Sequence, residues 1–178
     1  MNSFALFTDG SLNPMLTLGV GCYLLVPDSF LEVSPQNIES AELAERLILH
    51  RFEAASSAEL EVRTALRAFE DCRDQLKASV PLKLRLYTDS QCIAGLLKRR
   101  TGLEANSFLS NKTNLPLKNS SLYREFYKFH NELGFEITKV KGHTCSCYRD
   151  TVHSIFSFID REARKALKLL IKELGSKY

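Results

Sequence analysis

The sequence predicts an α/β protein built on a sheet of mixed direction. Three segments rich in strand formers come first, at residues 3–8, 19–26 and 46–54, and would form an antiparallel meander. Helical and strand patterns then alternate to the end of the chain. This order of elements indicates that parallel strands are added to the meander.

Local patterns predict the remaining elements. A turn is expected at Gly10–Pro14, and the turn formers at 27–45 predict a long connection with a helical turn at 39–45. Ser56 or Ser57 is a good N-cap for a helix whose apolar residues recur with helical spacing as far as Leu76. Further strands are predicted at 82–87 and 135–141, and further helices at about 91–100, 120–133 and 154–174.

Composition indicates one soluble domain over residues 1–178, with 44% hydrophobic and 25% charged residues. No apolar run approaches the roughly 18 residues that cross a bilayer, and the chain starts with a predicted strand rather than a leader. We expect a cytoplasmic monomer. The five cysteines are interpreted as reduced thiols. Zinc binding by Cys145 and Cys147 with His143 and His153 is disfavoured, because the spacing is not that of a structural site.

Two similar segments each end an apolar run with an aspartate. Phe-Thr-Asp-Gly-Ser at 7–11 is followed later by Tyr-Thr-Asp-Ser-Gln at 87–91, which places Asp9 and Asp89 at the ends of two predicted strands. A single aspartate there is usually a turn or cap former. Two such carboxylates on neighbouring strands repel each other unless a cation lies between them, and magnesium prefers oxygen ligands.

Basic residues are concentrated in two places. Between Lys98 and Lys128 there are seven basic and two acidic residues, and we interpret this segment as a surface for polyanions, with Arg99 and Arg100 as phosphate contacts. The last helix carries five more basic residues: Arg161, Arg164, Lys165, Lys168 and Lys172. Basic residues on a helix more often form only its solvated face, which is how we interpret these.

Six segments carry a resemblance to a known family. They are FTDGSLNP at 7–14, SSAELE at 56–61, YTDSQ at 87–91, PLKNSSLY at 116–123, KVKGH at 139–143 and IDREARKAL at 159–167. In this order they resemble the ribonuclease H family, type 1. The resemblance implies a five-stranded mixed sheet flanked by helices. It also implies an endonuclease that uses two Mg²⁺ ions, or Mn²⁺ in their place, to cut the RNA strand of an RNA/DNA hybrid.

The resemblance implies that carboxylates hold the metal ions, with Asp9 bridging both and Asp89 on the ion that activates water. The helix after Ser57 offers Glu59 or Glu61 as a third ligand. Residues two apart on a helix face about 200° apart, so only one can reach the site. Glu61 shares its face with the apolar residues Ala65, Ala68 and Phe69, which favours Glu61.

A fourth carboxylate is expected near the start of the last helix. Asp150 is closer to His143, but Asp160 precedes an apolar helix face in the family's manner, so we choose Asp160 as the ligand. The loop before it is longer than in the common bacterial form. By the same resemblance, His143 follows a strand and a glycine and would transfer a proton at product release.

Only the 2′-hydroxyl distinguishes a hybrid from DNA, so polar side chains near the site must contact the RNA strand. Positions similar to the family's substrate contacts are Ser11, Asn13, Ser57, Gln91 and Asn119. Two alternatives stay open: a DNA strand-transfer or junction-resolving nuclease, and a hybrid-binding module without catalysis. The Gly-His pair and the hybrid-contacting positions disfavour the first, and the full set of acids disfavours the second.

Overall fold

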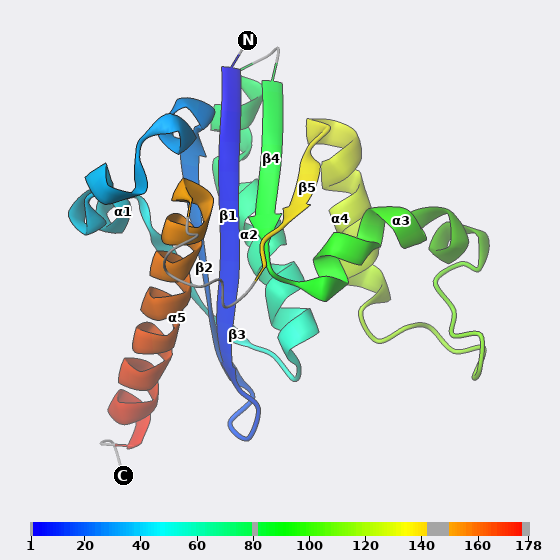
Figure 1. Cartoon of the computed structure of the whole chain (residues 1–178). Coiled ribbons are helices and arrows are strands. Elements are labelled where there is room, and N and C mark those ends of the chain that lie inside the picture. Colours follow the sequence, from blue (N-terminus) through cyan, green and yellow to red (C-terminus); the bar gives the residue numbers. More distant parts are fainter. Residues whose placement is uncertain (1, 80–81, 142–149, 176–178) are drawn as a thin grey trace.

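The computed structural model describes residues 2–79, 82–141 and 150–175. Its five strands form one sheet in the order β3-β2-β1-β4-β5 (Figure 1). Their bounds are β1 (Asn2–Asn13), β2 (Leu18–Pro27), β3 (Ile48–Glu53), β4 (Leu82–Thr88) and β5 (Glu136–Lys139). The first three strands pair antiparallel, and β4 pairs parallel with both β1 and β5. The predicted mixed sheet, a meander followed by parallel strands, is confirmed.

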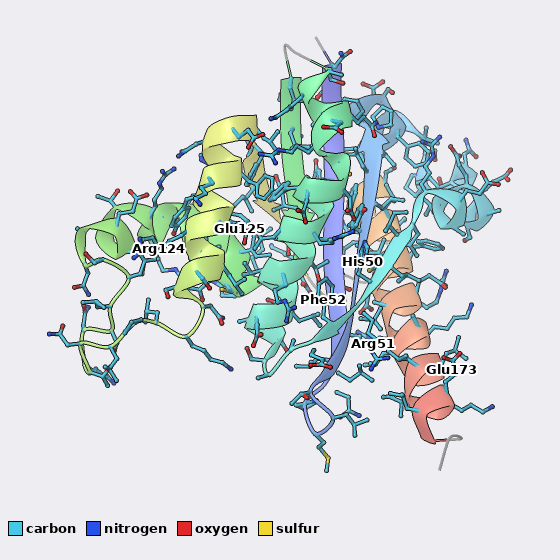
Figure 2. The ribbon with its side chains drawn as sticks, turned by 180° about the vertical axis from the view of Figure 1, so that it is seen from behind. His50, Arg51, Phe52, Arg124, Glu125 and Glu173 are labelled. Atoms are coloured by element: carbon cyan, nitrogen blue, oxygen red, sulfur yellow. The ribbon has the colours of Figure 1, made fainter. Side chains whose placement is uncertain are left out.

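Helices cover both faces of the sheet. Their bounds are α1 (Ser40–Arg46), α2 (Ser57–Lys77), α3 (Gln91–Ala105), α4 (Ser120–Leu133) and α5 (Thr151–Gly175), with short 3-10 turns at Asp28–Glu32 and Pro35–Asn37. One core lies between the sheet and α2, α3 and α4, and a second core packs α5 and α1 against the other face. Seen from behind, α2 lies across the sheet, with α4 to one side and the edge strand β3 to the other (Figure 2). Among the described helices, none is long and apolar enough to cross a membrane.

The main departure from the prediction is the length of β1. We predicted a strand end at residue 8 and a turn at Gly10–Pro14, but β1 continues to Asn13 because Gly10–Asn13 pair with Leu18–Gly21 of β2. The prediction that Asp9 ends a strand was therefore wrong, and the hairpin turn lies at 14–17. Asp9 lies inside the central strand, where pairing with β2 continues after β4 has ended.

Glycines allow α2 to lie close to the sheet. A Cβ on Gly10 would be 3.0 Å from Leu60 Cδ2, and a Cβ on Gly21 would be 2.0 Å from Thr64 Oγ1. Leu60 and Thr64 belong to the first two turns of α2 and are almost fully buried. The missing side chains on β1 and β2 thus let the beginning of α2 approach the sheet. Glu61 lies in this part of the helix.

Candidate active site

Asp9 and Asp89 lie on neighbouring parallel strands. The last paired residues of β1 and β4 are Phe7 and Tyr87, and the same register continued by two residues brings Asp9 level with Asp89. Asp9 is buried within β1, whereas Asp89 follows the last residue of β4 and is exposed. The predicted pairing of these two carboxylates beside the central strand is therefore present.

The carboxylate of Asp9 is held in an environment that opposes ionisation. Burial, followed by the charge of Asp89, raises the pKa of Asp9 to about 7, and the charges of Asp160 and Glu61 add to this effect. The backbone N–H of Gly10 donates a 2.7 Å hydrogen bond to Asp9 Oδ1, which acts in the opposite direction. The charges of three other acids therefore act on Asp9, and a cation would relieve this repulsion.

Glu61 belongs to this cluster and Glu59 does not. The hydroxyl of Ser90 donates a hydrogen bond to Glu61, and partial burial together with the charge of Asp89 raises the pKa of Glu61. Glu59 instead forms ion pairs with Arg63 at 3.6 Å and Lys118 at 3.7 Å. The helical spacing that favoured Glu61 therefore selected the glutamate that lies beside the two aspartates.

Asp160 on α5 provides the fourth carboxylate. Its charge raises the pKa of both Asp9 and Asp89, in each case in addition to burial, and Arg164 Nη2 contacts its Oδ1 at 2.8 Å. Asp150 lies just before α5, where its Oδ1 accepts bonds from the backbone N–H of His153 at 2.9 Å and from the His153 ring at 2.7 Å. Asp150 therefore caps the helix, and Asp160 is the acid that faces the cluster.

The donor set fits a hard divalent cation, because all four groups are carboxylates. In residues 2–79, 82–141 and 150–175, no three His, Cys, Asp or Glu side chains stand close enough to share one ion. Three of the carboxylates instead contact protein groups: Asp9 contacts Gly10 N–H, Glu61 contacts Ser90, and Asp160 contacts Arg164. Each of these contacts uses one carboxylate oxygen, so the other oxygen of each group would have to approach a common ion in order to coordinate it.

Sequence reasoning missed two positioning residues in the segment around Asp89. Ser90 is the N-cap of α3, where its Oγ accepts from Ile93 N–H at 3.1 Å, and it also holds Glu61. Lys139, at the end of β5, donates a hydrogen bond to Gln91. Burial raises the pKa of Asp89, and the positive charge of Lys139 lowers it. The cap role of Ser90 was visible as a serine before a helix, but its contact with Glu61 depends on tertiary packing.

The predicted substrate residues belong to β1, α2, α3 and the N-cap of α4. Asn13 Oδ1 accepts from the N–H groups of Met15 and Leu16, both at 3.1 Å, so part of its role is to close the β1–β2 turn. Ser11 is half-buried on β1, and Ser57 is exposed at the start of α2, where Ser56 provides the cap. Gln91 is exposed in the first turn of α3.

Asn119 is the N-cap of α4, where its carbonyl oxygen accepts from the backbone N–H of Tyr123 at 3.0 Å. Three residues considered from the sequence, His143, Cys145 and Cys147, lie outside the described residues. The other three cysteines, Cys22, Cys72 and Cys92, are free thiols, in agreement with the predicted reduced state.

The basic segment Lys98–Lys128 is more engaged within the fold than predicted. Arg99 donates to Cys92 O at 3.1 Å, and Arg100 donates to Glu104 at 2.8 Å and to Asn131 at 2.7 Å. Arg124, labelled on α4 in Figure 2, donates to Ser107 O at 3.0 Å and lies over the Phe108 ring. An arginine has five N–H donors, so these contacts leave some free for phosphates.

Sequence comparison assigns the family. The model of the RNase H family matches residues 1–167. The chain belongs to the RNase H family. A search of curated proteins found no match for this RNase H sequence.

Solved structures share the fold at low sequence identity. The solution structure of the PFV RNase H domain is 16% identical, covers 94% of each chain and has a TM-score of 0.61. LC11-RNase H1, isolated from compost by a metagenomic approach, is 10% identical over 96% of this chain and 99% of that one, with a TM-score of 0.60. The foamy viral protease-reverse transcriptase in complex with dsDNA is 14% identical over 86% of this chain and 90% of that one, with a TM-score of 0.54.

Proposed function

We propose that this RNase H protein is an endonuclease that hydrolyses the RNA strand of RNA/DNA hybrids with two divalent metal ions. The observation that carries this proposal is the gathering of four carboxylates at the end of β4. Asp9 comes from β1, Asp89 follows β4, Glu61 comes from α2 and Asp160 from α5. Helices on opposite faces of the sheet therefore contribute to one acidic centre. Such a centre, within a chain that matches the family over residues 1–167, supports metal-dependent phosphodiester hydrolysis.

Bound Mg²⁺, held by Asp9, Glu61, Asp89 and Asp160, would supply an activated water and stabilise the leaving oxygen. The chain's own residues would hold and orient this site. Asp9 is the most buried of these four acids and would hold the ions from inside β1, whereas the exposed Asp89 would hold them where water has access. Ser90 would keep Glu61 turned toward the cluster. His143 remains our choice, from the sequence, for moving a proton at product release.

Recognition of the RNA strand would depend on hydrogen bonds to 2′-hydroxyl groups. Asn13 uses its Oδ1 to close the hairpin turn, so its amide group remains as a donor. The contact with Lys139 fixes the Gln91 side chain next to Asp89. Ser11, Ser57 and Asn119 complete the set that we propose. These groups can donate to or accept from a 2′-hydroxyl without reading the base.

The direct test uses an RNA/DNA hybrid labelled on the RNA strand, with duplex DNA, duplex RNA and a four-way DNA junction as competing substrates. We expect cleavage of the hybrid alone, in Mg²⁺ or Mn²⁺, with none in EDTA and none for Asp89→Asn. Cleavage restricted to DNA or the junction would favour the strand-transfer or junction-resolving alternative. Binding of the hybrid without cleavage under any divalent cation would favour the inactive binding module.

A further inference from the structure

The outward face of α5 carries five basic residues that we name the α5 stripe: Arg161, Arg164, Lys165, Lys168 and Lys172. All five are exposed. The opposite face of the helix packs on β1 and β2, where Leu167 lies against Leu18 and Val20. In Figure 1, α5 lies in front of the sheet beside β1 and runs down toward the end of the described chain.

The α5 stripe begins at the acidic centre. Arg161 directly follows Asp160 in the sequence, and Arg164, one helical turn further along α5, contacts Asp160 at 2.8 Å. Together with Asp160 and Leu169, the stripe lines a single shallow depression on the surface of α5. A strand of nucleic acid placed at the acidic centre would therefore meet this surface directly beside it.

The positive charge of the stripe is only partly neutralised. Arg161 and Lys165 share one carboxylate, that of Glu162, at 3.3 and 3.5 Å. Within the described part of the chain, Lys168 and Lys172 have no ion pair. Neighbouring cations repel one another, and a polyanion would relieve this repulsion. This differs from the segment Lys98–Lys128, whose arginines are engaged within the fold.

We propose that the α5 stripe binds consecutive phosphates of the nucleic-acid strand that leads away from the acidic centre. The choice of an RNA/DNA hybrid as its ligand rests on the proposed function. Arg161 and Lys172 are separated by about 16 Å along the helix axis at 1.5 Å per residue, which is enough to face several phosphates. Such contacts contribute affinity without reading sequence. This proposal goes beyond our interpretation of these residues as only a solvated helix face.

The test measures the salt dependence of binding for Lys168→Gln/Lys172→Gln. The probe is a 20-base-pair RNA/DNA hybrid in EDTA, where metal-dependent cleavage cannot interfere. Loss of two phosphate contacts should weaken binding and flatten the slope of log affinity against log salt by roughly 1.4 to 1.8. The control, Lys77→Gln/Lys83→Gln, removes the same charge at the end of α2 and the start of β4 and should keep the wild-type slope.

A second variant, Lys168→Arg/Lys172→Arg, keeps the charge and should restore the slope, which a general loss of folding would not allow. An unchanged slope for the glutamine variant would overturn the proposal. So would reduced binding to phosphatidylserine vesicles with unchanged hybrid binding, which would assign the stripe to a lipid surface. Cleavage by the wild type in Mg²⁺ is measured separately. If the wild type cuts the hybrid but the glutamine variant leaves the slope unchanged, only the proposal for the α5 stripe is contradicted. If the slope changes but the wild type does not cut, only the proposed nuclease function is contradicted.

Discussion

The hydroxyl of Ser90 donates a hydrogen bond to the carboxylate of Glu61. This bond joins the first turns of α2 to the residue that directly follows Asp89. Ser90 is also the N-cap of α3, so one side chain connects two helices at the acidic centre. The position of Glu61 therefore depends on the segment that carries Asp89, and a change in either should affect the other.

Replacing Ser90 by alanine should impair catalysis more than it impairs folding. The change removes a cap worth about 1 kcal/mol of stability and also the bond that orients Glu61. We expect about a tenfold loss in kcat/KM at low Mg²⁺, equivalent to about 1.4 kcal/mol of transition-state stabilisation. Thermal unfolding and the Mg²⁺ dependence of cleavage measure the two effects.

Ser56→Ala is the matched control for Ser90→Ala, because Ser56 caps α2 by accepting from Glu59 N–H at 3.2 Å. We expect it to lower the unfolding temperature by a similar amount without changing the Mg²⁺ dependence. Equal effects of the two variants on Mg²⁺ dependence would mean that the Ser90–Glu61 bond has no role in the site.

Glu61→Gln and Asp160→Asn should each remove a metal ligand, while their nearby counterparts should not. Loss of a residue that only supports a metal ligand costs about 10- to 100-fold in metal affinity or activity. Loss of the ligand itself should cost more, so we expect turnover to fall beyond this range. Glu59→Gln breaks surface ion pairs and Asp150→Asn weakens a helix cap, so both should stay close to wild type in turnover. Steady-state cleavage of the hybrid measures all four, and an essential Glu59 would contradict our placement of α2.

The stability of the metal-free protein should depend on pH through Asp9. Because the pKa of Asp9 is about 7 in the folded protein, against 3.8 as the ordinary value, the folded state binds the proton more tightly. This contribution to stability is fully present below about pH 4 and is lost as the pH rises through about 7. At about 1.4 kcal/mol per pH unit, the loss attributable to Asp9 is at most about 4 kcal/mol.

Asp9→Asn should remove this dependence and also abolish cleavage. Raised pKa values at Asp89 and Glu61 act in the same direction, so the relevant quantity is the difference between wild type and variant. In EDTA, urea unfolding should find the variant more stable than wild type at pH 8, with a smaller advantage at pH 5. Mg²⁺ should raise the unfolding temperature of the wild type only. A variant less stable than wild type at pH 8 would show that the carboxylates do not repel each other as described.

The sequence predicted the parts of the fold that depend on local periodicity. The range 120–133 for α4 agrees with the structure, and Ala65 and Phe69 are buried on the α2 face that was used to choose Glu61. The extension of β1 was not predicted, because Gly10–Asn13 contains turn formers and becomes a strand only by pairing with β2. Local propensity was overridden there by a long-range partner.

The contacts of the arginines were also beyond sequence reasoning. A basic residue on a helix has no visible partner in the sequence, yet Arg100 reaches Asn131, which lies 31 residues further along the chain. For the same reason, the sequence alone does not show that Arg164 contacts Asp160. Each of the four acids occurs within a motif of the sequence, whereas the contact of Ser90 with Glu61 joins two elements and depends on the fold.

Gly21→Ala should destabilise the fold by forcing α2 away from the sheet. A Cβ at this position would be 2.0 Å from Thr64 Oγ1 and 2.8 Å from Phe52 Cε2, and overpacking of this kind costs about 1–3 kcal/mol. Thr64→Ala removes the nearer atom, so the double variant should recover part of the loss. Urea unfolding of the two single variants and the double variant measures the coupling, and fully additive losses would contradict the close approach of α2.

Arg99→Ala/Arg100→Ala tests whether the segment Lys98–Lys128 binds phosphates as well as stabilising the fold. The variant removes the bonds to Cys92 O and Asn131, and the contacts of both guanidinium groups with Tyr123 and Tyr127, so the unfolding temperature should fall. If the remaining N–H groups contact phosphates, KM should rise more than kcat falls, and the salt slope should flatten by up to about two. Lys77→Gln/Lys83→Gln again serves as the charge-matched control, with an unchanged slope expected.

A lower unfolding temperature with an unchanged slope would mean that these arginines only stabilise α3 and α4. In that case phosphate binding would have to be carried by other residues, and the α5 stripe would be the first surface to test.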